Sequence, residues 1–395
     1  MIVDTFGKKS VLFTFGTRPE VIKMVPVIRA FQRDPGFQTR VCVTAQHREL
    51  LDPLLKFFAL QPDHDLNVMR PGQSLAAMTS KIVTACEEVF ERSRPDLMFV
   101  QGDTTSAFAA AVAASQCKIP VAHIEAGLRS HQKSSPFPEE INRVMIAHLA
   151  ELHFTPGQLA LENLQREGII RGVYAVGNTV VDTLRLTLPA LAQQDEQPYL
   201  AKFPCASLER QVLLVTLHRR ESFGEPMQQM CSAVRRIAEQ HPKAEIFFPV
   251  HPNPQVQGLV QQTLQGISNV HLLEPLPYEQ FIWLLSRASL VISDSGGVLE
   301  EAETLGLPVL VAREVTERME AISDGNARLV GSDASRIVAE AGTMLAVVPP
   351  SRRLSPLRQT FGDGYASERI LQLTREHMEF SGLSRAALST HLSAA

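Results

Sequence analysis

Short, continuous apolar runs alternate along this chain with longer stretches that have helical spacing. In the first half the runs cover residues 11–15, 40–44, 97–100, 121–124, 152–155 and 173–176. In the second half they cover residues 212–216, 245–250, 270–273, 290–293, 309–311 and 327–330. Continuous apolar runs are typical of strands that are buried on both faces of a parallel sheet. Because helical stretches such as 76–92, 105–115 and 227–240 separate them, the pattern predicts an α/β fold with parallel sheets.

The alternation breaks once, between residues 182 and 210, where a helical piece is mixed with glutamines, Asp195 and Pro198. Each side of this stretch has enough strands for one doubly wound sheet. We therefore expect two Rossmann-like domains that face each other across a cleft, an N-terminal domain at residues 1–180 and a C-terminal domain at 181–365. A further helical pattern covers residues 367–380.

The composition is that of a soluble globular protein. The chain has 395 residues, of which 45% are apolar and 20% charged, and its net charge is -4. This charge offers no general basic field for nucleic acid, although a local basic pocket for a small anion is compatible with it. No run approaches the ~20 apolar residues of a membrane span. The start of the chain has no apolar signal segment, so we expect neither a membrane protein nor a secreted one.

The five cysteines lie far apart in the sequence, and no two of them form a C-x-x-C motif. An odd number of scattered cysteines in a chain of this length does not indicate a disulfide framework. We expect reduced thiols in a cytoplasmic protein.

Polar residues follow most of the predicted strands. In an open α/β sheet, ligands bind outside the carboxyl ends of the strands. In the first half these ends carry Gly16-Thr17-Arg18, Gln46-His47-Arg48, Gly102-Asp103-Thr104 and Glu125-Ala126-Gly127. In the second half they carry His218-Arg219-Arg220, His251-Pro252-Asn253 and Asp294-Ser295-Gly296-Gly297. Two facing sheets would direct these residues into one cleft.

The turn at residues 294–297 is a candidate phosphate site, because small residues at a helix start leave backbone N–H groups open to an anion. The alternative is an ordinary helix with Ser295 as its N-cap. Arg18 offers a forked guanidinium for phosphate oxygens, and its alternative is a surface arginine paired with Glu20. His218 lies in a basic cluster that favours an anion site.

Four carboxylates, Asp103, Glu125, Glu139 and Glu140, are candidates for acid and base chemistry. Asp103 and Glu125 follow neighbouring apolar runs, and carboxylates flanked by apolar sequence are candidates for a raised pKa. The alternative for Asp103 is to cap a helix that starts near residue 105. Glu139 and Glu140 stand in the first turn of a predicted helix, where acids are common. Arg143 is then either an active-site group or the helical ion-pair partner of Glu139.

Several chemistries have no motif in this sequence. There is no G-x-G-x-x-G, no G-K-[ST], no H-E-x-x-H and no G-x-S-x-G, which speaks against a bound nicotinamide, a P-loop, a zinc protease helix and a nucleophile elbow. Asp63-His64-Asp65 contains ligand types but falls in an expected loop without a second cluster. We expect no cofactor and no metal in the active site.

The ordered set of motifs resembles the non-hydrolysing UDP-N-acetylglucosamine 2-epimerases, from about residue 11 to 375. The matching segments are, in chain order, Gly16-Thr17-Arg18-Pro19-Glu20, Thr44-Ala45-Gln46-His47-Arg48, Gly102-Asp103-Thr104-Thr105, His123-Ile124-Glu125-Ala126-Gly127-Leu128-Arg129, Pro138-Glu139-Glu140-Ile141-Asn142-Arg143, Gly177-Asn178-Thr179, His218-Arg219-Arg220-Glu221 and Asp294-Ser295-Gly296-Gly297. The resemblance implies the GT-B fold, with a C-terminal helix at residues 366–395 that joins the N-terminal domain. It also implies interconversion of UDP-GlcNAc and UDP-ManNAc for surface polysaccharide synthesis, by a cytoplasmic homodimer.

The resemblance also implies roles for single residues. Asp103, Glu125 and Glu139 match the catalytic acids of the family, and Arg143 and His218 match its other active-site residues. The residues implied in UDP binding are Arg18, His218, Phe281, Ser295, Gly296, Gly297 and Glu301. Gln46, His47 and Gln73 fall where bacterial members bind a second, activating UDP-GlcNAc.

Carbon 2 of the sugar is not next to a carbonyl group, so simple deprotonation and return is difficult. Transient oxidation would need a dinucleotide motif, which the sequence lacks. The scheme that fits the residues is elimination of UDP to give a glycal-like intermediate, followed by readdition of UDP. That scheme needs acid and base groups around the sugar and a strong hold on the diphosphate. Three alternatives stay open at this point: a hydrolysing epimerase, a GT-B glycosyltransferase and a binding or sensor protein.

Overall fold

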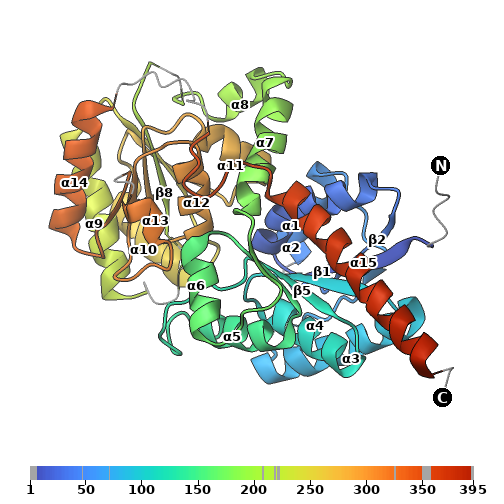
Figure 1. Ribbon diagram of the computed structural model, residues 1–395. Helices are drawn as coiled ribbons and strands as arrows, with labels where there is room; N and C mark the ends of the chain where they lie inside the picture. Colours follow the sequence, from blue (N-terminus) through green and yellow to red (C-terminus); the bar gives the residue numbers. More distant parts are fainter. Residues whose placement is uncertain are drawn as a thin grey trace. The chain divides into compact units, whose positions relative to one another are not determined.

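The computed structural model describes residues 7–46, 48–70, 72–206, 209–217, 219, 223–323, 326–348 and 357–392, with side chains up to residue 379. The chain divides into two compact units (Figure 1). Unit 1 comprises Met1–Thr183 and Gly362–Ala395, and unit 2 comprises Leu184–Phe361. Helix α7 (Thr179–Ala192) contains the boundary between them.

Unit 1 is built on a parallel sheet with the strand order β3-β2-β1-β4-β5-β6-β7. Its strands are β1 (Lys9–Phe15), β2 (Phe37–Val43), β3 (His64–Asp65), β4 (Leu97–Gln101), β5 (Val121–Ile124), β6 (Leu152–Thr155) and β7 (Val173–Ala175). Its helices besides α7 are α1 (Arg18–Arg33), α2 (Arg48–Phe57), α3 (Leu75–Ser93), α4 (Thr105–Gln116), α5 (Glu139–Leu149), α6 (Gln158–Arg166) and α15 (Ala366–Leu392). The strand order reverses between β1 and β4, and ligands bind at such reversal points in open α/β sheets.

Helices cover both faces of this sheet. Successive side chains of each strand point to opposite faces, so each strand contributes apolar side chains to both layers. On one face Phe13 stacks on Phe99 with ring centroids 4.5 Å apart, and Phe31 of α1 meets Phe13 edge-on. On the other face Leu12 and Met98 belong to a buried cluster with the small side chains of α4. The alanines of α4 allow α3 and α5 to pack closely against it.

The C-terminal helix α15 packs against α1 of unit 1 (Figure 1). Its first turn is fixed by Asp182, whose carboxylate accepts hydrogen bonds from the N–H of Ser367 at 2.8 Å and of Ala366 at 3.3 Å. A carboxylate at a helix N-terminus satisfies backbone donors that the helix itself leaves open. Arg369 adds a hydrogen bond to the carbonyl of Val176 at 3.0 Å.

Unit 2 is built on a second parallel sheet, with the order β10-β9-β8-β11-β12-β13. Its strands are β8 (Val212–Thr216), β9 (Glu245–Pro249), β10 (Val270–Leu273), β11 (Leu290–Ser293), β12 (Val309–Val311) and β13 (Ala327–Leu329). Its helices are α8 (Gln197–Lys202), α9 (Glu225–Gln240), α10 (Pro254–Leu264), α11 (Tyr278–Leu285), α12 (Gly296–Thr304), α13 (Met319–Ser323) and α14 (Ala334–Val347). Here the order reverses between β8 and β11.

The two faces of β9 carry different partners. Ile246 and Phe248 point into a core formed with α9, α10 and α14. Phe247 points the other way and meets Phe203 edge-on, with centroids 6.0 Å apart, and Phe203 stacks on Trp283 of α11. Glu245 lies two residues before Phe247 and therefore on the same face.

The predicted α/β class with two parallel sheets is confirmed, and each predicted strand appears within three residues of its expected ends. The expected loop at residues 63–65 is wrong, because His64 and Asp65 pair with Cys42 and Val43 as the short edge strand β3. Within the described part of the chain, no helix is long and apolar enough to cross a membrane. Cys42, Cys86 and Cys231 are buried free thiols, and burial raises the pKa of each of them.

Candidate functional site

The turn after β1 is packed so tightly that its first residue must be glycine. A Cβ atom at Gly16 would lie 1.9 Å from Oγ1 of Thr44 and 2.6 Å from Oγ of Ser106. These two hydroxyls are hydrogen-bonded to each other at 2.8 Å, and the Ser106 hydroxyl also donates to Oε1 of Gln46 at 2.8 Å. The ends of β1, β2 and β4 therefore meet at one place, and Gln46 is held beside it.

Glu20 fixes the backbone of the same turn. Its carboxylate accepts the N–H groups of Gly16 at 3.0 Å and Thr17 at 2.7 Å, and the Thr104 hydroxyl at 2.8 Å. With Thr17 it forms the capping box of α1. Burial raises the pKa of Glu20 to about 7. Arg18, the first residue of α1, is half-buried, so the sequence-predicted phosphate ligand starts from a rigid turn.

Asp103 and Arg143 form a salt bridge between the loop after β4 and helix α5. Nε of Arg143 lies 3.1 Å from Oδ2 of Asp103, and Nη2 donates to the same oxygen. Asn142 of α5 donates to the backbone carbonyl of Asp103 at 2.9 Å. The N-cap of α4 is Thr104, whose hydroxyl accepts the N–H of Ala107. Asp103 is therefore not used as the helix cap.

Glu140 serves the structure of α5. Its carboxylate accepts a hydrogen bond from Nη1 of Arg143 at 3.0 Å. It also accepts the backbone N–H groups of Ser130 at 3.0 Å and His131 at 2.9 Å. With only 3% of its surface exposed, it anchors the segment that leads into the helix. Glu139, by contrast, is the first residue of α5 and is half-buried. The predicted catalytic acid Glu139 thus begins the same helix that carries Glu140 and Arg143.

Glu125 is held in an unusual backbone conformation by buried partners. Its φ angle is 63°, in the left-handed region that non-glycine residues rarely adopt. Nζ of Lys23 lies 2.5 Å from its Oε1, both side chains are less than 10% exposed, and Gln101 donates to its Oε2. Strain of this kind persists where the surroundings enforce it, and it is concentrated at functional sites.

Glu125 and Asp103 lie at the ends of neighbouring strands. Gln101 of β4 is paired in register with Ile124 of β5, directly before each loop. A Cβ atom built on Gly102 would lie 3.6 Å from the Glu125 carboxylate. The structure therefore brings together two of the three predicted catalytic acids.

A buried histidine supports the loop that carries Asp103. Nε2 of His123 donates to the Gly102 carbonyl at 2.7 Å. Burial lowers the pKa of His123 to about 3, so the ring is neutral at physiological pH. A neutral ring can donate this hydrogen bond without placing a charge in the core.

The residues expected at a second sugar site are only partly described. Gln46 is bound to Ser106, as above, and His47 lies outside the described residues. Gln73 lies between β3 and α3, where its amide contacts Sδ of Met69 and accepts a hydrogen bond from Lys81 at 3.2 Å.

In unit 2, the turn after β11 opens α12 without using the Ser295 hydroxyl. Ser295 stands at the N-cap position, but its side chain makes no cap hydrogen bond. The Ser295 N–H donates to the hydroxyl of Ser293 at 3.0 Å, and the carboxylate of Asp294 accepts the N–H of Arg219 at 2.9 Å. Asp294 thus ties the end of β11 to the segment after β8, at the reversal point of the sheet.

Gly296 faces a buried arginine. A Cβ atom there would lie 2.6 Å from Cζ of Arg318, so no larger residue fits without displacing the guanidinium. Arg318 is 8% exposed, and it pairs with Glu300 through Nε at 2.9 Å and with Glu317. At Gly297 a Cβ atom would meet none of the described residues within 4 Å, which leaves the backbone of this turn accessible. The guanidinium of Arg318, with its charge balanced by these two carboxylates, thus lies beside the first residue of α12.

The remaining predicted UDP ligands are placed as follows. Glu301 lies in the second turn of α12 and is 5% exposed. Phe281 belongs to α11 and is 6% exposed. His218 lies outside the described residues.

Sequence reasoning did not single out Lys23 or Arg318. Both are buried cations that contact predicted site residues, Glu125 and Gly296. For Lys23 the signal was present, because it lies within a helix whose other buried residues are mostly apolar. For Arg318, which is flanked by Glu317 and Met319, no local pattern indicates burial.

Comparisons with known proteins agree on one family. The family model described as UDP-N-acetylglucosamine 2-epimerase matches residues 29–375. The UDP-N-acetylglucosamine 2-epimerase of Escherichia coli K12 is 43% identical over 370 residues, which is 93% of this chain and 98% of that protein. The crystal structure of the Neisseria meningitidis UDP-GlcNAc 2-epimerase bound to UDP-GlcNAc has a TM-score of 0.89 and 40% identity, and covers 93% of this chain and 100% of that one.

A glycotransferase of kitacinnamycin, at 14% identity and a TM-score of 0.60, shares the fold alone. The predicted GT-B class, in the sense of two parallel-sheet α/β domains, is therefore confirmed. With a family model covering most of its length and a relative at 43% identity, this chain belongs to the UDP-N-acetylglucosamine 2-epimerase family.

Proposed function

We propose that this protein interconverts UDP-GlcNAc and UDP-ManNAc by anti-elimination and readdition of UDP through 2-acetamidoglucal, and that it supplies surface polysaccharide synthesis. Family membership supports action at C2 of UDP-GlcNAc. The elimination route is supported by the kinds of residues that the two units present at their strand ends.

The observation that carries the proposal is the setting of Glu125. An ammonium group at 2.5 Å and an amide donor hold its carboxylate, and its backbone φ of 63° directs it from the end of β5. A nearby positive charge favours the ionised form of a carboxylate. An ionised, rigidly held carboxylate is suited to taking up a proton from carbon or to steadying the developing charge.

Asp103 and Glu139 supply the complementary acid and base positions. Asp103 is held by Arg143 at the neighbouring strand end, and Glu139 begins the helix that carries Arg143. Removal of the C2 proton on one face and its return on the other requires two separate groups. Unit 1 provides three carboxylates for these tasks, and the anti geometry of the elimination then divides them between the two faces of the sugar.

The departing UDP needs a site that stabilises its negative charge. In unit 2 the Ser295 hydroxyl, which does not cap α12, the accessible backbone at Gly297 and the start of the helix offer donors for a diphosphate. The guanidinium of Arg318 packs beside Gly296, and its own charge is balanced by Glu300 and Glu317. Arg18, from the rigid turn after β1, and His218 complete the proposed set of diphosphate ligands.

One incubation tests the reaction type. The purified protein is given UDP-GlcNAc alone, and the products are followed by proton NMR. We expect UDP-GlcNAc and UDP-ManNAc to reach a stable mixture, with free UDP only in traces. Stoichiometric free ManNAc and UDP would instead identify a hydrolysing epimerase. No change until an acceptor sugar is added would identify a GT-B glycosyltransferase.

A further inference from the structure

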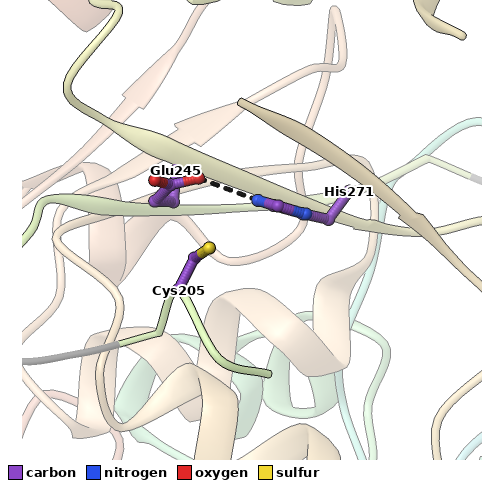
Figure 2. A group of neighbouring side chains, drawn as sticks. All are labelled: Cys205, Glu245 and His271. Carbon is purple, nitrogen blue, oxygen red and sulfur yellow. Dashed lines mark hydrogen bonds and ion pairs between the residues drawn. The ribbon is translucent and has the colours of Figure 1, made fainter. Parts of the chain in front are cut away.

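Unit 2 contains a cluster of three side chains of the types that bind transition metals. The thiol of Cys205, the carboxylate of Glu245 and the imidazole of His271 each offer one ligand atom, and these atoms lie within 4.8 Å of one another (Figure 2). Cys205 follows α8, Glu245 is the first residue of β9, and His271 belongs to β10. Three separate elements therefore converge on one point.

The pairing of β9 with β10 fixes the positions of two of the three residues, Glu245 and His271. His271 is paired in register with Phe247 of β9, and Glu245 lies two residues before Phe247 on the same face. Nε2 of His271 lies 2.8 Å from Oε2 of Glu245. The imidazole stacks on the Phe247 ring, with centroids 4.7 Å apart and an interplanar angle of 22°. The ring orientation is thus fixed by packing as well as by the carboxylate.

Glu245 is arranged as a ligating carboxylate usually is. It is 3% exposed, and its Oε1 is already bound by Arg210, which leaves Oε2 directed at His271. Ligating carboxylates and histidines commonly have such outer partners, which orient them. Arg210 also offsets part of the carboxylate charge, so the cluster is suited to a single divalent ion.

We propose that Cys205, Glu245 and His271 form a binding site for Zn²⁺. Thiolate, imidazole and carboxylate are the ligand types of zinc, and the thiol makes Mg²⁺ or Ca²⁺ a poor alternative. Tetrahedral zinc with ligand distances of about 2.0–2.3 Å requires ligand atoms roughly 3.3–3.6 Å apart. Oε2 and Nε2 need to separate by about half an ångström from their present 2.8 Å, and Cys205 needs to move inward by about 1 Å at most. Cys205 is half-buried in a connecting segment, where such a movement is small.

The site is distinct from the proposed diphosphate site of the same unit. Glu245 stands at the amino end of β9, whereas residues 295–297 follow the carboxyl end of β11. Because all strands of this sheet are parallel, the amino ends and the carboxyl ends of the strands lie on opposite sides of the unit. Zinc binding is therefore independent of the epimerase proposal, and it would tie the segment after α8 to β9 and β10.

The test uses the full-length protein after treatment with a chelator and reducing agent. Zn²⁺ binding is measured by competition with a chromophoric chelator, and Co²⁺ is added separately to detect a thiolate-to-metal charge-transfer band. The variants are Cys205→Ser and His271→Ala. The matched control is Cys117→Ser, which removes another half-buried thiol, from unit 1. Epimerase turnover and circular dichroism show that each variant is folded.

We expect one Zn²⁺ per chain for the unchanged protein and for Cys117→Ser, and affinity lower by about 100-fold in each ligand variant. The cobalt charge-transfer band should be lost in Cys205→Ser and kept in Cys117→Ser. A hundredfold excess of zinc over its Kd should raise the Tm of the unfolding step of unit 2 by roughly 5–10 °C. Absence of stoichiometric binding, or equal binding by Cys205→Ser and Cys117→Ser, would show that the cluster is only an ion-pair group with a neighbouring thiol.

Discussion

The buried pair formed by Lys23 and Glu125 allows stability and catalysis to be separated. Glu125→Gln removes the charge that faces the Lys23 ammonium at 2.5 Å, where neither side chain is more than 8% exposed. At that separation and an effective dielectric constant of about 20, Coulomb's law gives roughly 7 kcal/mol of attraction. Desolvation of both charges offsets much of it. Removing one partner of a buried pair typically costs about 3–5 kcal/mol.

We therefore expect Glu125→Gln and Lys23→Met each to lower the stability of unit 1 by about 3 kcal/mol. For a unit of this size that corresponds to a decrease in Tm of roughly 10 °C. The double variant leaves no isolated charge, so its stability should return to within about 1–2 kcal/mol of the unchanged protein. Calorimetry measures the thermal unfolding of all four proteins, and the stability of each is compared with that of the unchanged protein.

Catalysis should not return with stability. Glu125→Gln should lower kcat by at least ~100-fold, and the double variant should stay equally slow, because the carboxylate is still missing. A restored kcat in the double variant would show that Glu125 matters only for the fold. Strictly additive losses of stability would show that the two charges do not interact as the 2.5 Å contact indicates.

Three further outcomes follow from the same structure. Asp103→Asn and Glu139→Gln should each lower kcat at least ~100-fold while leaving UDP affinity, measured by calorimetry, unchanged; normal turnover in either would remove that residue from the mechanism. Arg18→Ala should weaken UDP binding by about ten- to a hundredfold, and unchanged affinity would refute its role as a diphosphate ligand. Burial raises the pKa of Glu20 from 4.5 to about 7. The folded protein therefore binds this proton more tightly than the unfolded chain, which stabilises the fold. The stabilisation is complete below pH 4.5 and is lost as the pH rises through 7. Relative to Glu20→Gln, the unchanged protein should therefore lose about 3 kcal/mol of stability between pH 4.5 and pH 8, and a constant difference across this range would contradict the assignment.

The sequence predicted the sheets well because their strands are buried on both faces. Runs such as Val121–Ile124 and Leu290–Ser293 are mostly apolar, fully buried and followed by polar turns, so hydrophobicity marks them. The strand His64–Asp65 was missed for the opposite reason. It is two residues long, lies at the sheet edge and contains no apolar residue, so only its pairing with β2 defines it.

The sequence predicted which residues belong to the candidate site, but not which of them form ion pairs with one another. Short motifs indicated Asp103, Glu125 and Arg143, and the local partner that sequence spacing offered for Arg143 was Glu139. The structure pairs Arg143 with Asp103, 40 positions away, and with Glu140. Long-range pairs of this kind, like Lys23 with Glu125, depend on how neighbouring strands and helices meet, and no local pattern encodes them.

The most direct test of the proposed mechanism is turnover in D2O. If a carboxylate removes the C2 proton on one face and a second group returns a proton on the other, the UDP-ManNAc formed carries deuterium at C2. Prolonged incubation then labels the remaining UDP-GlcNAc, and slow release of free UDP with 2-acetamidoglucal accompanies the exchange, with no requirement for nicotinamide. UDP-ManNAc that retains protium fully at C2 after turnover in D2O would contradict elimination and readdition.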